Sequence, residues 1–142
     1  MKTSTKHSIP IFFLMIIISS IAFLSCEKEV NEENLFDKKW ILTEIETDTA
    51  DILPVKEIFI EFSDSTITGK GGCNGYWIND YILDGNEFNV NSIISTDIYC
   101  GKQISGIEET YFKVLRSAEK IKIVGTKLKI KGELGKLKYK KE

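Results

Sequence analysis

Short segments in which apolar and polar residues alternate recur along the chain after residue 35, and this alternation constrains the fold more than any other feature. In Lys127–Lys131 and Lys136–Lys140 every second residue is a lysine, and the residues between them are apolar. A period of two places the apolar side chains on one face of a strand and the lysines on the other. These segments are therefore predicted to be strands with one buried face and one solvated face.

Further strands are predicted where β-branched and aromatic residues cluster between turn-forming residues. Ser63-Asp64-Ser65 marks a hairpin turn after the strand at Glu57–Phe62, and Asp84-Gly85-Asn86 marks a second turn. The remaining predicted strands cover residues 39–45, 66–69, 73–77, 81–83, 87–90, 93–96, 120–124 and 134–139.

One segment has the period of a helix instead. Between Gly106 and Ala118 the apolar residues recur every three or four positions, which forms the stripe of an amphipathic helix. Ser105 is the predicted N-cap, and Glu108 three residues later would complete a capping box. Many short strands and one late helix predict a mainly β (α+β) fold, either a small antiparallel β-barrel or a strongly curved sheet, with one helix packed near residues 106–118.

The first 25 residues have the composition of a secretory signal peptide. Lys2 and Lys6 precede an apolar run over residues 9–24, which is shorter than the ~20 residues that a membrane-spanning helix needs. Phe23-Leu24-Ser25-Cys26 then resembles the lipobox of bacterial lipoproteins, in which the cysteine is acylated and becomes residue one. Residues 1–25 are predicted to be removed and Cys26 to carry a membrane anchor. An uncleaved short anchor, with Cys26 as a bystander, is the alternative.

Residues 26–34 are predicted to form a flexible tether and residues 35–142 the folded domain, because the segment after Cys26 is charged and has no apolar period. The chain carries 19 Lys+Arg and 21 Asp+Glu, so losing Lys2 and Lys6 leaves 17 against 21 and a formal net charge of −4. This balance argues against nucleic-acid binding. The one histidine, His7, lies in the signal, so the mature chain lacks the base of Ser-His-Asp or Cys-His catalysis and the commonest metal ligand.

Four glycines lie close together in Gly69–Gly75, which permits positive φ and close backbone approach, as at a bulge or a barrel corner. No Lys-Ser or Lys-Thr pair follows, so this is not a phosphate-binding loop. Cys73 in this segment and Cys100 are the cysteines that remain after lipidation, and in an exported protein we expect them to form a disulfide. Two reduced thiols are an alternative, and a metal site is a weaker one.

Several motifs follow one another in an order that resembles the META/HslJ family of bacterial envelope domains. They are Trp40-Ile41-Leu42, Gly72-Cys73-Asn74, a threonine four residues before Cys100, and Glu108-x-x-Tyr111. The resemblance spans essentially the whole predicted domain and implies a compact β-barrel-like fold and an envelope location. Family members have been connected with heat-shock expression and antibiotic tolerance, and no agreed biochemical activity follows from membership.

These features predict a membrane-anchored envelope lipoprotein whose domain is a non-enzymatic binding or stress-response accessory module. The alternative is a passive or inhibitory interaction domain that acts on an envelope partner. The candidate binding surface is Asn74, Tyr76 and Tyr99, for a peptide, a glycan or an envelope protein. We expect a monomer without cofactor or metal, on the periplasmic or surface face of the outer membrane.

Overall fold

A computed structural model describes residues 30–142, so the predicted signal peptide and Cys26 lie outside the described residues. The two described helices are α2 (Glu32–Leu35) and α3 (Lys102–Arg116). The strands are β1 (Lys39–Glu46), β2 (Asp51–Ile52), β3 (Phe59–Phe62), β4 (Ile67–Lys70), β5 (Gly75–Ile78), β6 (Tyr81–Asp84), β7 (Glu87–Val90), β8 (Ile94–Ser95), β9 (Ala118–Val124), β10 (Lys127–Gly132) and β11 (Gly135–Lys141).

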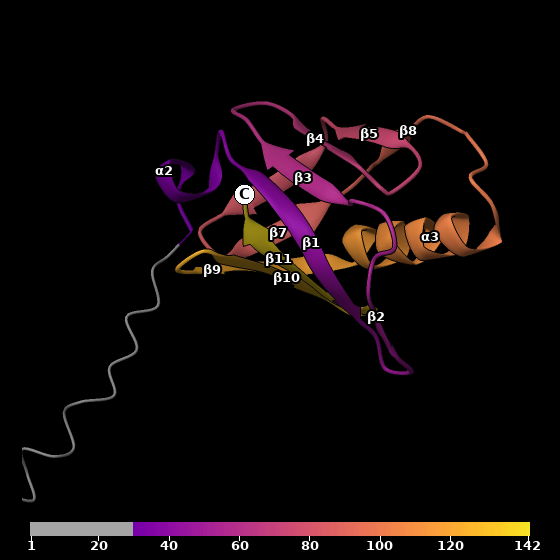
Figure 1. The fold of residues 1–142 in the computed structure, drawn as a ribbon. Coiled ribbons are helices and arrows are strands. Elements are labelled where there is room, and N and C mark those ends of the chain that lie inside the picture. The colour runs from indigo at the N-terminus through magenta and orange to yellow at the C-terminus, as the bar shows by residue number, and fades with distance from the viewer. Residues whose placement is uncertain (1–29) are drawn as a thin grey trace, which may run out of the picture.

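The strands form one antiparallel sheet in the order β6-β7-β9-β10-β11-β1-β3-β4-β5-β8, with β2 beside β1. The sheet curls strongly into a half-barrel, and α3 packs against it (Figure 1). This confirms the predicted mainly β fold with one packed helix. Within residues 30–142, neither helix has the length and apolar character that a membrane span requires.

Alternate residues of the strands fill the interior of the half-barrel. On β10, Leu128 and Ile130 are buried and the three lysines beside them are exposed, as the alternation predicts. The rings of Phe62 and Phe88 meet edge to face with centroids 5.8 Å apart, although their strands, β3 and β7, are not neighbours in the sheet. The curl therefore brings the two arms of the sheet together around one apolar core.

Residues 30–34 contact the domain, whereas they were predicted to be part of a flexible tether; residues 26–29 of that tether lie outside the described residues. Val30 is 5% exposed, and its N–H donates to Asn86 Oδ1 at 3.2 Å. Leu35 at the end of α2 is fully buried, and its carbonyl accepts the indole N–H of Trp40 at 3.1 Å. Residues 30–34 are thus ordered against the sheet, because Val30 and Leu35 supply apolar anchors at either end of a polar stretch.

Helix α3 begins at Lys102, four residues before the predicted start, and the predicted capping box is wrong. Gly101, at φ 88°, is the N-cap and turns the chain into the helix. Ser105 lies inside the helix, where its hydroxyl accepts the Cys100 N–H at 3.3 Å. The helix ends at Arg116, and Ala118 already belongs to β9.

Candidate functional site

The buried carboxylate of Glu108 holds the glycine-rich turn against α3. Its Oε1 accepts the backbone N–H groups of Cys73 at 3.1 Å and of Asn74 at 2.6 Å, and its Oε2 accepts the Asn74 side-chain amide at 2.6 Å. Glu108 is 6% exposed and Asn74 5% exposed. Glu108 is therefore the acceptor of a distant turn, not part of a helix cap.

Asn74 extends this contact to the segment before Cys100. Its Oδ1 accepts the Ile98 N–H at 2.8 Å and the Thr96 hydroxyl at 2.7 Å. Its Nδ2 also donates to the Ile98 carbonyl at 3.0 Å. An amide offers two donors and one acceptor oxygen on one short side chain, and each is used here to join three segments that are distant in sequence.

Two glycines make the close approach of this turn to α3 possible. A Cβ on Gly71 would lie 2.7 Å from Glu108 Oε1 and 2.9 Å from the Phe112 ring. Gly72 has φ +110°, a conformation that side chains with a Cβ disfavour. The Gly71-Gly72-Cys73-Asn74 sequence thus forms a scaffold, in which glycine provides room and Asn74 provides hydrogen bonds.

The predicted Cys73–Cys100 disulfide is present and closes the same scaffold. The two cysteines are 27 positions apart in sequence, and their Cα atoms are 5.9 Å apart. The bond joins the glycine-rich turn to the residue just before the Gly101 cap of α3. The backbone of residues 96–100 is therefore fixed at one end by Asn74 and at the other by the disulfide.

The side chains carried by this fixed backbone point into solvent. Ile98 is 58% exposed and Tyr99 76% exposed. Ile94 on β8 is also exposed, and its cross-strand partner on β5 is Trp77, a further exposed aromatic. Directly opposed residues share one face of a sheet. We call these four residues, Trp77, Ile94, Ile98 and Tyr99, the 94–99 surface.

A depression lies between residues 95–97 and α3. It has a volume of about 340 Å³, and Ser95, Thr96 and Asp97 line one side. Glu109 and Arg116 of α3 line the other side. The depression therefore carries side chains of both charges.

The structure places only one of the three predicted surface residues in solvent. Tyr99 is exposed, whereas Asn74 and Tyr76 are buried, so that part of the candidate surface is wrong. Along β5 the alternation turns Tyr76 and Ile78 inward and Trp77 outward. Ile94 and Ile98 were missed, although their position in a β-branched run beside polar residues is a signal of partial exposure.

Tyr76 instead begins a chain of buried hydroxyl groups. The Tyr76 hydroxyl lies 2.7 Å from the Tyr111 hydroxyl, which accepts the Tyr139 hydroxyl at 3.2 Å. Burial raises the pKa of Tyr111 to about 12 and raises the pKa of Tyr76 and Tyr139 well above their ordinary value. These phenols are neutral at physiological pH, and their arrangement joins β5, α3 and β11 inside the core.

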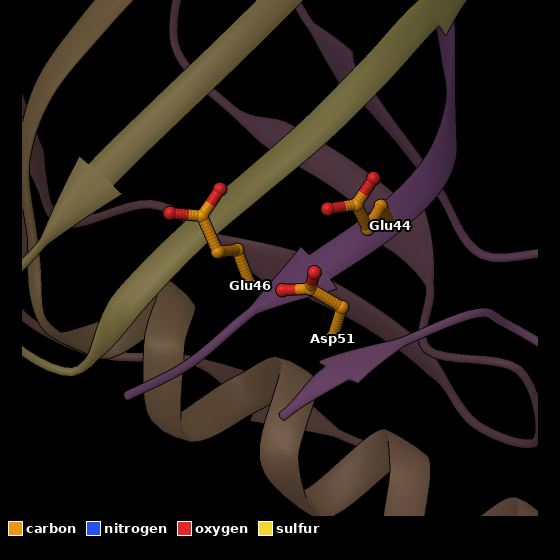
Figure 2. A group of neighbouring side chains, drawn as sticks. All are labelled: Glu44, Glu46 and Asp51. Carbon is orange, nitrogen blue, oxygen red and sulfur yellow. The ribbon is translucent and has the colours of Figure 1, made fainter. Parts of the chain in front are cut away.

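A cluster of three carboxylates lies on the outside of the sheet. Figure 2 shows Glu44 and Glu46 projecting from β1 and Asp51 from β2 on one side of the sheet, with carboxylate oxygens within 4.8 Å of one another. The Lys138 ammonium lies 2.6 Å from Glu44 and 2.9 Å from Glu46, and Lys136 also pairs with Glu46. Hydrogen bonds from Lys136 and then Lys138 hold the pKa of the Glu46 carboxyl at about 2. Lysine ammonium groups thus already supply the cations of this cluster.

Comparison with known proteins gives a family and a fold. A family model described as META domain matches residues 33–142. An NMR structure of a protein from Burkholderia xenovorans has a TM-score of 0.63 at 17% identity, and the match covers 78% of this chain and 85% of that chain. A second NMR structure has a TM-score of 0.61 at 20% identity and covers 78% of this chain and 94% of that chain. No curated protein matches the chain.

Proposed function

The chain belongs to the META domain family, and from this premise we propose that it is a lipid-anchored protein of the bacterial cell envelope whose domain binds a protein partner through the 94–99 surface. The domain acts in this proposal as a binding module and not as an enzyme. The alternative is that the domain inhibits the partner that it binds.

The observation that carries the proposal is the contrast between backbone and side chains in residues 96–100. The backbone is held by Asn74 and by the disulfide, while Ile98 and Tyr99 are exposed. Large apolar side chains left in solvent on a fixed backbone are typical of interaction sites. A fixed backbone also lowers the conformational entropy lost on binding, because the side chains are already presented in place.

The arrangement of the carboxylates favours binding over catalysis. A general acid or base must reach a proton of the substrate, but both oxygens of the buried Glu108 accept hydrogen bonds from Cys73 and Asn74. In the outer cluster, Glu44 and Glu46 are paired with lysines. Both carboxylate groups are therefore explained by the stability of the fold.

Site-specific photocrosslinking tests the binding surface. A photoreactive phenylalanine analogue at position 99 is expected to crosslink a discrete envelope protein in cells, and Ile98→Ser is expected to weaken that crosslink at least tenfold. The matched control carries the analogue at Leu53, which is 69% exposed on another part of the domain. Equal crosslinking from positions 99 and 53, or no effect of Ile98→Ser, would contradict the proposed surface. Assaying the captured protein with and without the domain separates inhibition from simple binding.

Cell fractionation tests the anchor. The protein is expected in the membrane fraction, with the mass of a chain that starts at an acylated Cys26, and Cys26→Ala is expected to prevent both acylation and processing at residue 25. After removal of residues 1–25 by an inserted general signal-peptidase site, the alanine chain should be released from membranes. Cys73→Ser/Cys100→Ser is the matched control, which should stay in the membrane fraction. A wild-type chain that retains residues 1–25 would identify an uncleaved anchor instead.

A further inference from the structure

Three neighbouring strands present a continuous layer of lysines on the outside of the half-barrel. On β9, β10 and β11 the inward residues form part of the buried core. Lysines occupy the alternating outward positions, except for the exposed Val124 at the end of β9. We call this the lysine face; its members are Lys120, Lys122, Lys127, Lys129, Lys131, Lys136, Lys138 and Lys140.

The strand registers place these lysines directly opposite one another. Three lysine–lysine pairs join β10 to β11, and two join β9 to β10. Lys129, for example, lies between Lys122 and Lys138, and Lys131 lies between Lys120 and Lys136. Like charges in direct cross-strand positions destabilise a sheet. Uncharged polar residues would solvate this face equally well, so the lysines exceed what folding requires.

Glutamates on the two bordering strands pair with lysines at the edges of the lysine face. Glu87 on β7 is 3.5 Å from Lys120, and Glu44 and Glu46 on β1 pair with Lys136 and Lys138. The centre of the face, on β10, carries the exposed Lys127, Lys129 and Lys131. A chain with a net negative formal charge therefore concentrates positive charge over one strand of its surface.

Val30, the first described residue, lies close to β9, one of the strands of this face. Val30 donates to the side chain of Asn86, and the carbonyl of the same Asn86 accepts the Ile121 N–H of β9 at 2.9 Å. Cys26 precedes Val30 by four residues, which span at most ~14 Å when fully extended. A lipid on Cys26 would thus hold β9 and its neighbours within a short distance of the bilayer.

We propose that the lysine face docks on the anionic lipid headgroups of the membrane that holds the anchor. The proposal rests on the proposed function in one respect, the lipid at Cys26, which sets where the bilayer lies. Lysine ammonium groups attract phosphate headgroups as point charges, and clusters of four to eight are typical of surfaces that bind anionic lipid. A lipid chain and a polybasic surface together hold a protein on a membrane more stably than either does alone.

Vesicle co-sedimentation tests the docking without the anchor. The probe is the chain over residues 26–142 with Cys26→Ser, which keeps every described residue and also Glu27 and Glu29, whose charges oppose the attraction. The vesicles contain phosphatidylcholine with or without phosphatidylglycerol. Binding is expected only with phosphatidylglycerol. Each lysine contributes a factor of about five, so Lys127→Gln/Lys129→Gln/Lys131→Gln should weaken binding on the order of 100-fold.

Two further triple variants make the test specific. Lys127→Arg/Lys129→Arg/Lys131→Arg keeps the charges and should retain wild-type binding within about threefold. Lys56→Gln/Lys70→Gln/Lys102→Gln removes the same charge from exposed positions outside the lysine face and should also bind within about threefold of wild type. Thermal unfolding checks that the glutamine variant on β10 is folded, and relief of lysine repulsion should leave it at least as stable as wild type.

Three results would overturn the proposal: equal binding to vesicles with and without phosphatidylglycerol, equal losses in the two glutamine variants, or binding to soluble dextran sulfate with none to anionic vesicles. The fate of the anchor is measured separately by the mass of the mature chain. Vesicle binding by a chain that is not acylated in cells would support docking by the lysine face and contradict the anchor. Acylation without vesicle binding would support the anchor and contradict docking by the lysine face.

Discussion

Glu108→Ala is expected to lower the free energy of unfolding by about 4 kcal/mol, because three donors lose their common acceptor. The substitution removes the acceptor of three donors, the backbone N–H groups of Cys73 and Asn74 and the Asn74 side-chain amide. Each buried donor left without a partner costs about 1–3 kcal/mol, and hydrogen bonds to a charged group lie at the upper end. Asn74 would also lose the restraint that directs its oxygen to Ile98.

Urea unfolding of the oxidised protein measures this loss. Glu109→Ala is the matched control, because Glu109 is the next residue, is exposed, and forms a surface ion pair with Lys113 at 2.8 Å. Such exposed pairs contribute about 0.3–0.5 kcal/mol. Glu108→Gln, which keeps one acceptor oxygen, should fall between the two variants. If Glu108→Ala unfolds within 1 kcal/mol of the Glu109→Ala control, the carboxylate is not what holds the turn.

Removing the Cys73–Cys100 disulfide is expected to lower the free energy of unfolding by about 3.5 kcal/mol. The bond closes a loop of 27 positions, and the chain-entropy model assigns about this amount to a loop of that length. The same substitution frees one end of residues 96–100, so the 94–99 surface should become more mobile. Faster hydrogen exchange at Tyr99, with little change on β10, is the expected signature.

Cys73→Ser/Cys100→Ser and wild-type protein are compared by urea unfolding with and without reductant. Reductant should lower the stability of the wild type toward that of the variant and leave the variant unchanged. Mass spectrometry of the non-reduced protein provides an independent reading, and two free thiols in the folded wild type would refute the bond. A reductant effect of equal size in the variant would show that another property of the protein responds to it.

The parts of the fold that depend on local pattern could be predicted from the sequence. Alternation identified β10 and β11, and turn residues identified the hairpin of β3 and β4, because neighbouring residues determine both features. Which residues of β5 face the core could not be predicted in the same way. Alternation requires Tyr76 and Trp77 to face opposite sides, but both are aromatic, and only packing against Tyr111 and Phe112 determines that Tyr76 is inside.

Glu108 shows why the candidate site was harder to predict than the fold. Its spacing from Ser105 fits a capping box, so the local sequence alone predicts a role for Glu108 in capping the helix, and that prediction is wrong. The donors that it actually serves lie 34 and 35 positions earlier in the chain. Val30 is a similar case, because its N–H donates to Asn86, which lies 56 positions later in the chain. Such contacts depend on the strand order, which the sequence pattern does not determine.

The strand order also has a consequence for how the chain reaches its native state. β11 lies between β10 and β1, and the Thr43 hydroxyl donates to the Lys138 carbonyl across 95 positions of sequence. Closing such a large loop is entropically costly, and chains dominated by non-local pairing fold slowly. During synthesis one edge of β1 stays unpaired until residues 135–141 have emerged from the ribosome. With this topology the half-barrel closes around its core only once β11, the last strand in the sequence, is available to join β10 to β1.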